Sequence, residues 1–409
     1  MMSSIKLTPR NEKFTGRITL PLSKSISNRA LIISAISRGK VDPGELSESG
    51  DTKLLADLLF QSLEGKIKTL NAANAGTVFR FLTAYLSIQE GEWTLEGDDR
   101  MRQRPIAPLV NALRELGADI SYLDKTGAPP IHIKGKTLAG GKVNISTDIS
   151  SQFISALMMI GPAMKNGLQI HLDTDPESLP YIRMTEKLML LSGAKVLLGN
   201  HTIMVNGTGY GHAILPNEAD WSAAAFWYEI FALSREKQMF IDSLEEKSLQ
   251  GDAMAERYFR MLGVETEFRG GGAWLSRFYW SGEVIRADLS YTPDLAPALI
   301  VATAARRKAG DFIGLKNLRH KESDRLNALL TELGKAGITC NSTSGSLSFE
   351  AQQMNITEPF DTYGDHRLAM AFAPLAFMGT PVTINDPDVV NKSYPGFWDE
   401  IQKVLDVRF

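Results

Sequence analysis

The sequence predicts an α/β protein of two domains, each built from three similar units. Three observations support this: the length of 409 residues, six apolar segments with polar starts, and short strand-like segments between them. A chain of this length is long enough for two hydrophobic cores. With 44% hydrophobic and 22% charged residues, the composition is typical of a soluble globular protein.

Six helices are predicted where a short polar segment leads into a run that is apolar on all sides. A helix that is apolar on every face is buried, so we expect these six to be inner helices. Their starts lie about 50 to 75 residues apart, which indicates an internal repeat. The six segments are 23–36, 74–88, 150–161, 220–233, 292–304 and 364–377.

A second, amphipathic helix is predicted after each inner helix. The leucines of 54–59 share one face, as do those of 326–333, which suits a helix with one solvated side. Four such helices end in a Gly that precedes strand-like residues, where a C′ residue needs positive φ. These are Gly117, Gly193, Gly263 and Gly337. The repeated unit is therefore helix, helix, strand.

Short strands are predicted between the helices, and their distribution suggests a domain boundary. They are expected at 17–20, 93–95, 131–133, 168–172, 202–205 and 382–384. Three units precede residue 217 and three follow it. We therefore expect one domain of residues 21–217 and a second of residues 218–409, to which residues 1–20 return.

The charge balance excludes bulk attraction to nucleic acid or to an anionic membrane. The net charge is −3 and the isoelectric point is near 6.1, so any cationic cluster is local and suits small anions. Cys340 is the only cysteine, which excludes an internal disulfide and suits a reducing compartment; we expect it to pack inertly in a strand at 338–340. No segment reaches the apolar length of a membrane span, so a cytoplasmic protein is expected.

Residues 23–29 combine two cations and three hydroxyls immediately before an apolar run. The first N–H groups of a helix lack intrahelical partners, so phosphate or carboxylate binds there, and Lys24 and Arg29 add full charges. The alternative is structural: Ser27 or Asn28 caps a core helix while the two cations are solvated. The recurrence of similar starts along the chain favours an anion site.

Other polar clusters also precede helices, and each has a structural alternative. Arg100, Arg102 and Arg104 either face a ligand or pair with nearby acids on a surface turn. The charged run 319–325 is either a solvated face or a site in which Lys321 and Arg325 share one helical face. For Asp294, capping and general-base roles are both open.

Ten segments, taken in order along the chain, resemble the signature segments of the EPSP synthase family of enolpyruvyl transferases. They extend from Leu20 to Trp398 and therefore span nearly the whole chain. The segments are LPLSKSISNRAL, NAGTVFRFL, RMRQRPI, DISSQF, SLPYI, PNEADWSAA, YTPDLAPAL, LRHKESDRL, YGDHRLAMA and VVNKSYPGFW.

This resemblance implies a fold, an activity and a set of site residues. The fold would be two domains, each of three βαβαββ units around buried inner helices, an inside-out α/β barrel with the active site in the interdomain cleft. The enzyme would transfer the enolpyruvyl group of phosphoenolpyruvate to the 5-hydroxyl of shikimate 3-phosphate. The residues implied for shikimate 3-phosphate are Lys24, Ser25, Arg29, Ser150, Ser151, Gln152, Ser178, Asp294, Asn317 and Lys321. Those implied for phosphoenolpyruvate are Lys24, Gly76, Arg104, Gln152, Arg325, Arg367 and Lys392.

In the implied reaction, Asp294 is the base, Glu322 protonates C3 of phosphoenolpyruvate and Lys24 lies close by. No cofactor, metal, nucleic acid or membrane is implied, and a monomer is expected. The chain departs from the family pattern at Leu22, Phe81 and Gly364, none of which is an implied ligand.

Two rival classes remain. The sister transferase that acts on UDP-N-acetylglucosamine typically has a loop cysteine before its third unit, far from Cys340. The second rival is a non-catalytic anion-binding protein or an RNA-end-processing relative.

Overall fold

The computed structural model divides the chain into two compact units. One comprises Ser23–Asn217; the other comprises Met1–Leu22 together with Glu218–Phe409. The structure describes residues 3–10, 16–63, 68–146 and 150–408, so Asp148 and Ile149 of the segment DISSQF lie outside the described residues. Pro21 and Leu22 belong to the second of these units, whereas the sequence pattern placed them in the other domain.

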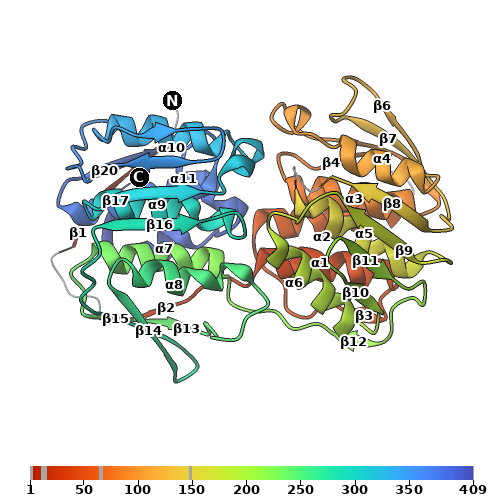
Figure 1. Ribbon diagram of the computed structural model, residues 1–409, viewed down its shortest axis with the longest axis horizontal. Coiled ribbons are helices and arrows are strands. Elements are labelled where there is room, and N and C mark those ends of the chain that lie inside the picture. Colours follow the sequence, from red (N-terminus) through yellow and green to blue (C-terminus); the bar gives the residue numbers. More distant parts are fainter. Residues whose placement is uncertain (1–2, 11–15, 64–67, 147–149, 409) are drawn as a thin grey trace. The chain divides into compact units, whose positions relative to one another are not determined.

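The Ser23–Asn217 unit consists of alternating helices and short strands (Figure 1). Its helices are α1 (Lys24–Ile36), α2 (Gly50–Leu63), α3 (Gly76–Ser87), α4 (Ala107–Glu115), α5 (Ser151–Ile160) and α6 (Leu179–Leu191). Its strands are β3 (Val41–Asp42), β4 (Thr69–Asn71), β5 (Gly91–Glu96), β6 (Asp119–Tyr122), β7 (Ile131–Gly135), β8 (Gly141–Ile145), β9 (Leu168–Leu172), β10 (Val196–Leu198), β11 (Thr202–Val205) and β12 (Ala213–Ile214).

The other unit repeats this composition, and both of its chain segments contribute strands. Its helices are α7 (Trp221–Leu233), α8 (Ala255–Arg260), α9 (Ala296–Ala305), α10 (Arg325–Lys335), α11 (His366–Phe372) and α12 (Phe397–Ile401). Its strands are β1 (Ser4–Pro9), β2 (Arg17–Ile18), β13 (Gln238–Asp242), β14 (Val264–Arg269), β15 (Gly272–Arg277), β16 (Val284–Asp288), β17 (Ala309–Ile313), β18 (Asn341–Ser342), β19 (Leu347–Phe349), β20 (Val382–Asn385) and β21 (Leu405–Arg408).

Four of the sheets have one topology. Their orders are β4-β5-β7-β6, β8-β9-β11-β10, β2-β13-β15-β14 and β16-β17-β19-β18. In each, the first two strands are parallel and the other neighbours are antiparallel. With the intervening helices, each sheet is one βαβαββ unit, as the resemblance implied.

The remaining two sheets of the described residues are reduced versions of the same unit. β3 and β12 form a parallel pair. In the other, β1 lies between β20 and β21, antiparallel to both, and a single parallel bridge joins Phe360 to Ile384 where a first strand would run.

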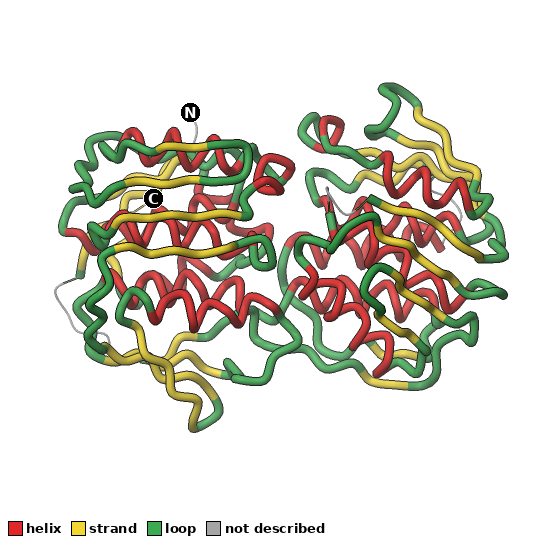
Figure 2. Tube along the Cα trace, in the orientation of Figure 1, coloured by secondary structure: helices red, strands yellow, loops and turns green. Residues whose placement is uncertain are grey.

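The six inner helices predicted from the sequence are present, and they form the core of each unit. α1, α3 and α5 pack against one another, as do α7, α9 and α11. All residues of α9 and α11 are buried. Figure 2 shows the helices of each unit grouped together, with strands running alongside them. Some hydroxyls inside these helices donate to the carbonyl one turn earlier, as from Thr83 to Phe79 and from Thr303 to Leu299, which pairs these buried donors.

The glycines predicted to end the amphipathic helices all have positive φ. The angles are 93° at Gly117, 79° at Gly193, 82° at Gly263 and 79° at Gly337. A side chain would be strained in this left-handed conformation, which explains why Gly recurs there.

Candidate functional site

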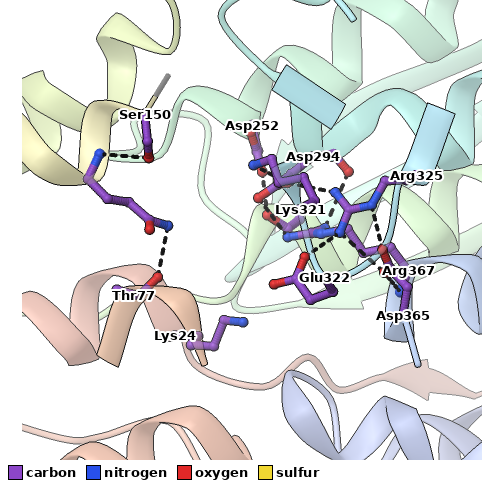
Figure 3. A network of polar contacts seen from close by, with 12 residues as sticks. Lys24, Thr77, Ser150, Asp252, Asp294, Lys321, Glu322, Arg325, Asp365 and Arg367 are labelled. Atoms are coloured by element: carbon purple, nitrogen blue, oxygen red, sulfur yellow. Dashed lines mark hydrogen bonds and ion pairs between the residues drawn. The ribbon is translucent and has the colours of Figure 1, made fainter. Parts of the chain in front are cut away.

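The densest charged cluster of the described residues surrounds Asp294. This residue lies in the 3₁₀ turn Pro293–Leu295 that leads into α9. Its Oδ1 lies 3.1 Å from Lys321 Nζ and 3.2 Å from an Arg325 terminal nitrogen. Its Oδ2 lies 2.9 Å from an Arg367 terminal nitrogen. Figure 3 shows the three cations around this carboxylate; Arg325 and Arg367 lie at the starts of α10 (Arg325–Lys335) and α11 (His366–Phe372), and Lys321 precedes α10.

Ion pairing determines the charge of Asp294. Burial raises the pKa of a carboxyl group, but Arg367, Lys321 and Arg325 together hold the pKa of Asp294 well below its ordinary value. Burial lowers the pKa of Lys321 more than Asp294 raises it. Without substrate, Asp294 is therefore ionised and a weak base.

Arg325 is the fixed centre of this cluster, because its fully buried side chain contacts three carboxylates. Besides Asp294, its guanidinium meets Glu322 Oε2 at 2.9 Å and both oxygens of Asp365, at 2.9 and 3.2 Å. Burial would lower its pKa, but the carboxylates raise it above the ordinary value. Ser323 donates a further hydrogen bond to Asp365.

The cluster differs from the sequence prediction in one respect. Lys321 and Arg325 do not share a helical face, because α10 begins at Arg325 and Asp324 caps it by accepting from the N–H of Asn327. Lys321 follows the 3₁₀ helix Lys316–His320 instead. The two cations nevertheless meet at Asp294.

Asp252 is a buried carboxyl group that the sequence pattern did not single out. It accepts a short hydrogen bond from the Ser222 hydroxyl, and Figure 3 shows it beside Asp294. Burial and the charge of Asp294 raise its pKa to about 6, with Arg367 opposing. No motif surrounds it in the sequence, since Gly251-Asp252 resembles an ordinary turn.

In the Ser23–Asn217 unit, Gln152 links the starts of α3 and α5. Its amide N–H₂ donates to Thr77 Oγ1 at 2.9 Å and its carbonyl accepts from Arg80, while its backbone N–H donates to Ser150, the N-cap residue. Arg80 was not predicted. It is 4% exposed and stacks over Phe153. An Arg within an otherwise apolar helix is the sequence signal that could have identified it.

Gly76 and Arg104, which the resemblance implies for phosphoenolpyruvate, are in close contact. A Cβ on Gly76 would lie 2.6–2.7 Å from the Arg104 guanidinium, whose NH1 also donates to the carbonyl of Asn74. Arg104 is 4% exposed, whereas Arg102 lies near Glu96 on the surface. Of these two arginines, only Arg104 is positioned like a ligand group.

The polar residues of segment 23–29 lie in two different environments at the start of α1. Lys24 Nζ lies 3.0 Å from Asp51. Arg29 is 2% exposed and donates to Thr185 Oγ1 at 2.7 Å, to the Ser25 carbonyl at 2.8 Å and to Ser155 Oγ at 3.3 Å. Burial lowers the pKa of Arg29 to about 10. The helix begins at Lys24, so Ser27 and Asn28 are not its caps.

The other implied ligands lie at helix starts or in 3₁₀ segments. Ser151 is the first residue of α5, and Ser178 is the N-cap residue of α6, with a φ of 59°. Asn317 lies in the 3₁₀ helix Lys316–His320 and Lys392 ends the 3₁₀ segment Pro387–Lys392.

Across the described ranges, no group of three or more His, Cys, Asp or Glu side chains is placed to hold a metal ion. The helices among these residues are all too short or too polar to cross a membrane.

Repeated βαβαββ units with buried inner helices, and cationic side chains at the helix starts, define a two-domain α/β enzyme that acts on small anions. The chain belongs to the EPSP synthase family. The profile described as EPSP synthase (3-phosphoshikimate 1-carboxyvinyltransferase) matches residues 9–401.

Similar proteins support this membership. The chain is 43% identical over 390 residues to a 3-phosphoshikimate 1-carboxyvinyltransferase of Bacteroides fragilis, which covers 94% of each chain. It is 34% identical over 427 residues to one of Shewanella piezotolerans, covering 98% of this chain and 99% of the other. In fold it resembles the solved EPSP synthase of Acinetobacter baumannii, with a TM-score of 0.73 at 21% identity, covering 99% of this chain and 100% of that one.

Proposed function

We propose that this protein transfers the enolpyruvyl group of phosphoenolpyruvate to the 5-hydroxyl of shikimate 3-phosphate, releasing phosphate. The observation that carries the proposal is the convergence of Lys321, Arg325 and Arg367 on Asp294. A carboxylate surrounded by cations suits a hydroxyl nucleophile that must attack an anionic partner. Membership of the family supplies the substrates.

The proposed ligand groups come from both compact units. Shikimate 3-phosphate would be held by Lys24, Ser25, Arg29, Ser150, Ser151, Gln152, Ser178, Asp294, Asn317 and Lys321. Phosphoenolpyruvate would be held by Lys24, Gly76, Arg104, Gln152, Arg325, Arg367 and Lys392. Both substrates are anions that repel each other, and Lys and Arg overcome this repulsion while paired guanidinium contacts fix orientation.

The proposed reaction is an addition followed by an elimination. Asp294 accepts the proton of the 5-hydroxyl group while the oxygen of that hydroxyl forms a bond to C2 of phosphoenolpyruvate. Glu322 delivers a proton to C3. The resulting tetrahedral intermediate then loses a proton from C3 to Glu322. The C2–O bond to the phosphate breaks with its electron pair, and the departing phosphate takes the proton held by Asp294, which restores the base. Lys24 is proposed to stabilise the charge of the transferred group.

The ion pairs of Asp294 suggest how its basicity changes. In the substrate-free protein, Arg367 and Lys321 lower its pKa. Phosphate and carboxylate groups of the substrates compete for the same cations. The attraction between these cations and Asp294 then weakens, and the affinity of Asp294 for a proton rises. The base thus becomes stronger when both anions are bound.

The proposal is tested by phosphate release from phosphoenolpyruvate, with shikimate 3-phosphate or UDP-N-acetylglucosamine as acceptor. Phosphate release is expected when shikimate 3-phosphate is the acceptor and not when the UDP-sugar is. Release only with the UDP-sugar, or with neither acceptor, contradicts the assignment. Cys340 is unsuited to a thiol role in the sister reaction, because burial raises its pKa to about 11.

A further inference from the structure

Segment 361–367 carries Asp365 and Arg367, and helix α10 holds it at two places. At the start of α10, Arg325 forms a two-pronged ion pair with Asp365. Seven residues later on the same helix, and so two turns along the same face, Glu332 contacts the beginning of the segment. The second attachment has no role in the chemistry proposed above.

Glu332 is fully buried, and its carboxylate holds both the backbone and a side chain of the segment. Its Oε2 accepts the N–H of Asp361 at 3.1 Å, and its Oε1 accepts the Tyr363 hydroxyl at 2.6 Å. Lys335, one turn further along α10, lies 3.0 Å from Glu332 and 2.6 Å from Asp361. Asn385 donates to the other oxygen of Asp361 at 2.7 Å.

The hydrogen bonds of this network stabilise the protonation states of Lys335, Asp361 and Tyr363. Hydrogen bonds to Asp361 and Glu332 overcome the effect of burial and raise the pKa of Lys335. Hydrogen bonds from Asn385 and Lys335 lower the pKa of Asp361. Burial and Glu332 raise the pKa of Tyr363 to about 12, so its hydroxyl keeps the proton that it donates. Lys335 and Asp361 therefore stay ionised and Tyr363 stays neutral, which are the states in which they form these contacts.

The network holds a turn that contains a left-handed non-glycine residue. Tyr363 and Gly364 are consecutive residues with positive φ, 54° and 69°. A left-handed conformation is strained for a non-glycine residue. Directly after this turn, Asp365 accepts the N–H of Arg367 at 3.0 Å, and the Arg367 side chain reaches Asp294.

We propose that Glu332, acting with Lys335 and Tyr363, is a positioning residue that holds the turn at 363–364 and thereby aims Arg367 at phosphoenolpyruvate. The inference rests on the proposed function for the identity of that substrate. The proposed shikimate 3-phosphate ligands all lie outside segment 361–367. Loosening the turn should therefore weaken the use of phosphoenolpyruvate selectively.

The test compares Glu332→Gln and Tyr363→Phe with the unaltered protein. A misplaced binding group costs up to about 100-fold in efficiency, so we expect the KM for phosphoenolpyruvate to rise about tenfold in Glu332→Gln and about threefold in Tyr363→Phe. The KM for shikimate 3-phosphate should change less than twofold. Tyr363→Phe removes one hydroxyl from a half-exposed ring, so it gives a result even if Glu332→Gln folds poorly.

Glu400→Gln is the matched control. Glu400 also pairs with a lysine three residues later, Lys403, and also accepts a backbone N–H, that of Thr19. It lies in α12, outside the proposed site, so neither KM should change.

Amide hydrogen exchange of segment 361–367 gives a readout that needs no turnover, and faster exchange is expected in both Glu332→Gln and Tyr363→Phe. If the unaltered protein shows no turnover but exchange rises in the variants, the proposed function fails while the positioning role stands. Unchanged exchange with an unchanged KM for phosphoenolpyruvate overturns the positioning role, as does an equal rise in both KM values.

Discussion

Arg29 and Arg325 are both buried guanidinium groups, but their surroundings give them opposite electrostatics. Hydroxyl and carbonyl oxygens accept from Arg29, and burial lowers its pKa to about 10. Carboxylates surround Arg325 and raise its pKa. Arg325 is therefore neutralised within the protein, whereas among the described residues the acceptors of Arg29 are hydroxyl and carbonyl oxygens, which leave its charge unbalanced. An anion that approaches Arg29 would therefore be attracted more strongly than one that approaches Arg325.

Replacing Asp294 by Asn tests the proposed base while keeping its shape. General-base catalysis contributes about 10²–10⁴-fold, so phosphate release should fall by at least about 100-fold. Binding of shikimate 3-phosphate, measured by calorimetry, should persist because the cations remain. Asp311→Asn is the control, since Asp311 is exposed and lies 3.9 Å from Arg286. Turnover within threefold of the unaltered protein would rule out Asp294 as the base.

Gly76→Ala tests the contact between Gly76 and Arg104. The added methyl group would lie 2.6–2.7 Å from the guanidinium, so Arg104 must move. We expect the KM for phosphoenolpyruvate to rise about tenfold, with little change for shikimate 3-phosphate. Gly334→Ala in α10 is the matched control, because an added Cβ there meets nothing within 4 Å. Equal kinetics for the two variants would show that Arg104 accommodates the methyl group.

At the scale of elements, helix α7 contains a buried titratable residue, Glu229, that the proposed site does not use. Glu229 is fully buried, and neither carboxyl oxygen has a hydrogen-bond partner among the described residues. Burial raises its pKa well above the ordinary value, which favours the neutral form in the folded chain. The folded chain therefore holds a proton that the unfolded chain releases above a pH of about 4.3.

Glu229→Gln should change the pH dependence of stability. Because the folded state binds the additional proton, stability is greatest below the unfolded pKa and falls as pH rises, by up to about 1.4 kcal/mol per pH unit. The variant has no titratable group at this position. Its free energy of unfolding should therefore fall less between pH 5 and pH 8 than that of the unaltered protein. Denaturant titration at both values measures this difference. Glu115→Gln, an exposed glutamate in α4, should keep the slope of the unaltered protein; the same slope in Glu229→Gln contradicts a buried neutral Glu229.

The elements could be predicted well because their signals are local. Polar starts before apolar runs predicted all six inner helices, and the terminal glycines predicted where amphipathic helices end. The predicted strand at 338–340 was wrong, since pairing begins at Asn341. Pairing depends on a partner strand distant in sequence, which the segment itself does not encode.

The site residues were predictable mainly where they form motifs. Lys321, Arg325 and Arg367 lie in dense polar runs and do converge, although the predicted helical relation between the first two was wrong. Arg80, Asp252 and Glu332 were missed. Each is a single polar residue beside apolar or ordinary turn residues, and tertiary packing brings Arg80 to Gln152, Asp252 to Ser222 and Glu332 to Tyr363.

At the scale of the whole molecule, the proposed ligands of shikimate 3-phosphate are divided between the two compact units. Lys24 and Gln152 belong to one, and Asp294 and Lys321 to the other. A ligand that binds residues of both restricts their motion. We therefore expect small-angle scattering to show a smaller radius of gyration at saturating shikimate 3-phosphate. Inorganic phosphate at the same concentration is the control, and unchanged dimensions at saturation count against shared binding.

The pairing of β1 and β2 has a consequence for biosynthesis. β1 lies between β20 and β21, and β2 pairs with β13, so the strands made before residue 23 find their partners only after residue 217 has been made. Among the described residues, the strands of the Ser23–Asn217 unit pair only with one another, so this unit can fold while the ribosome is still translating. Throughout that interval β1 and β2 are unpaired edges, exposed to neighbouring chains and available to chaperones.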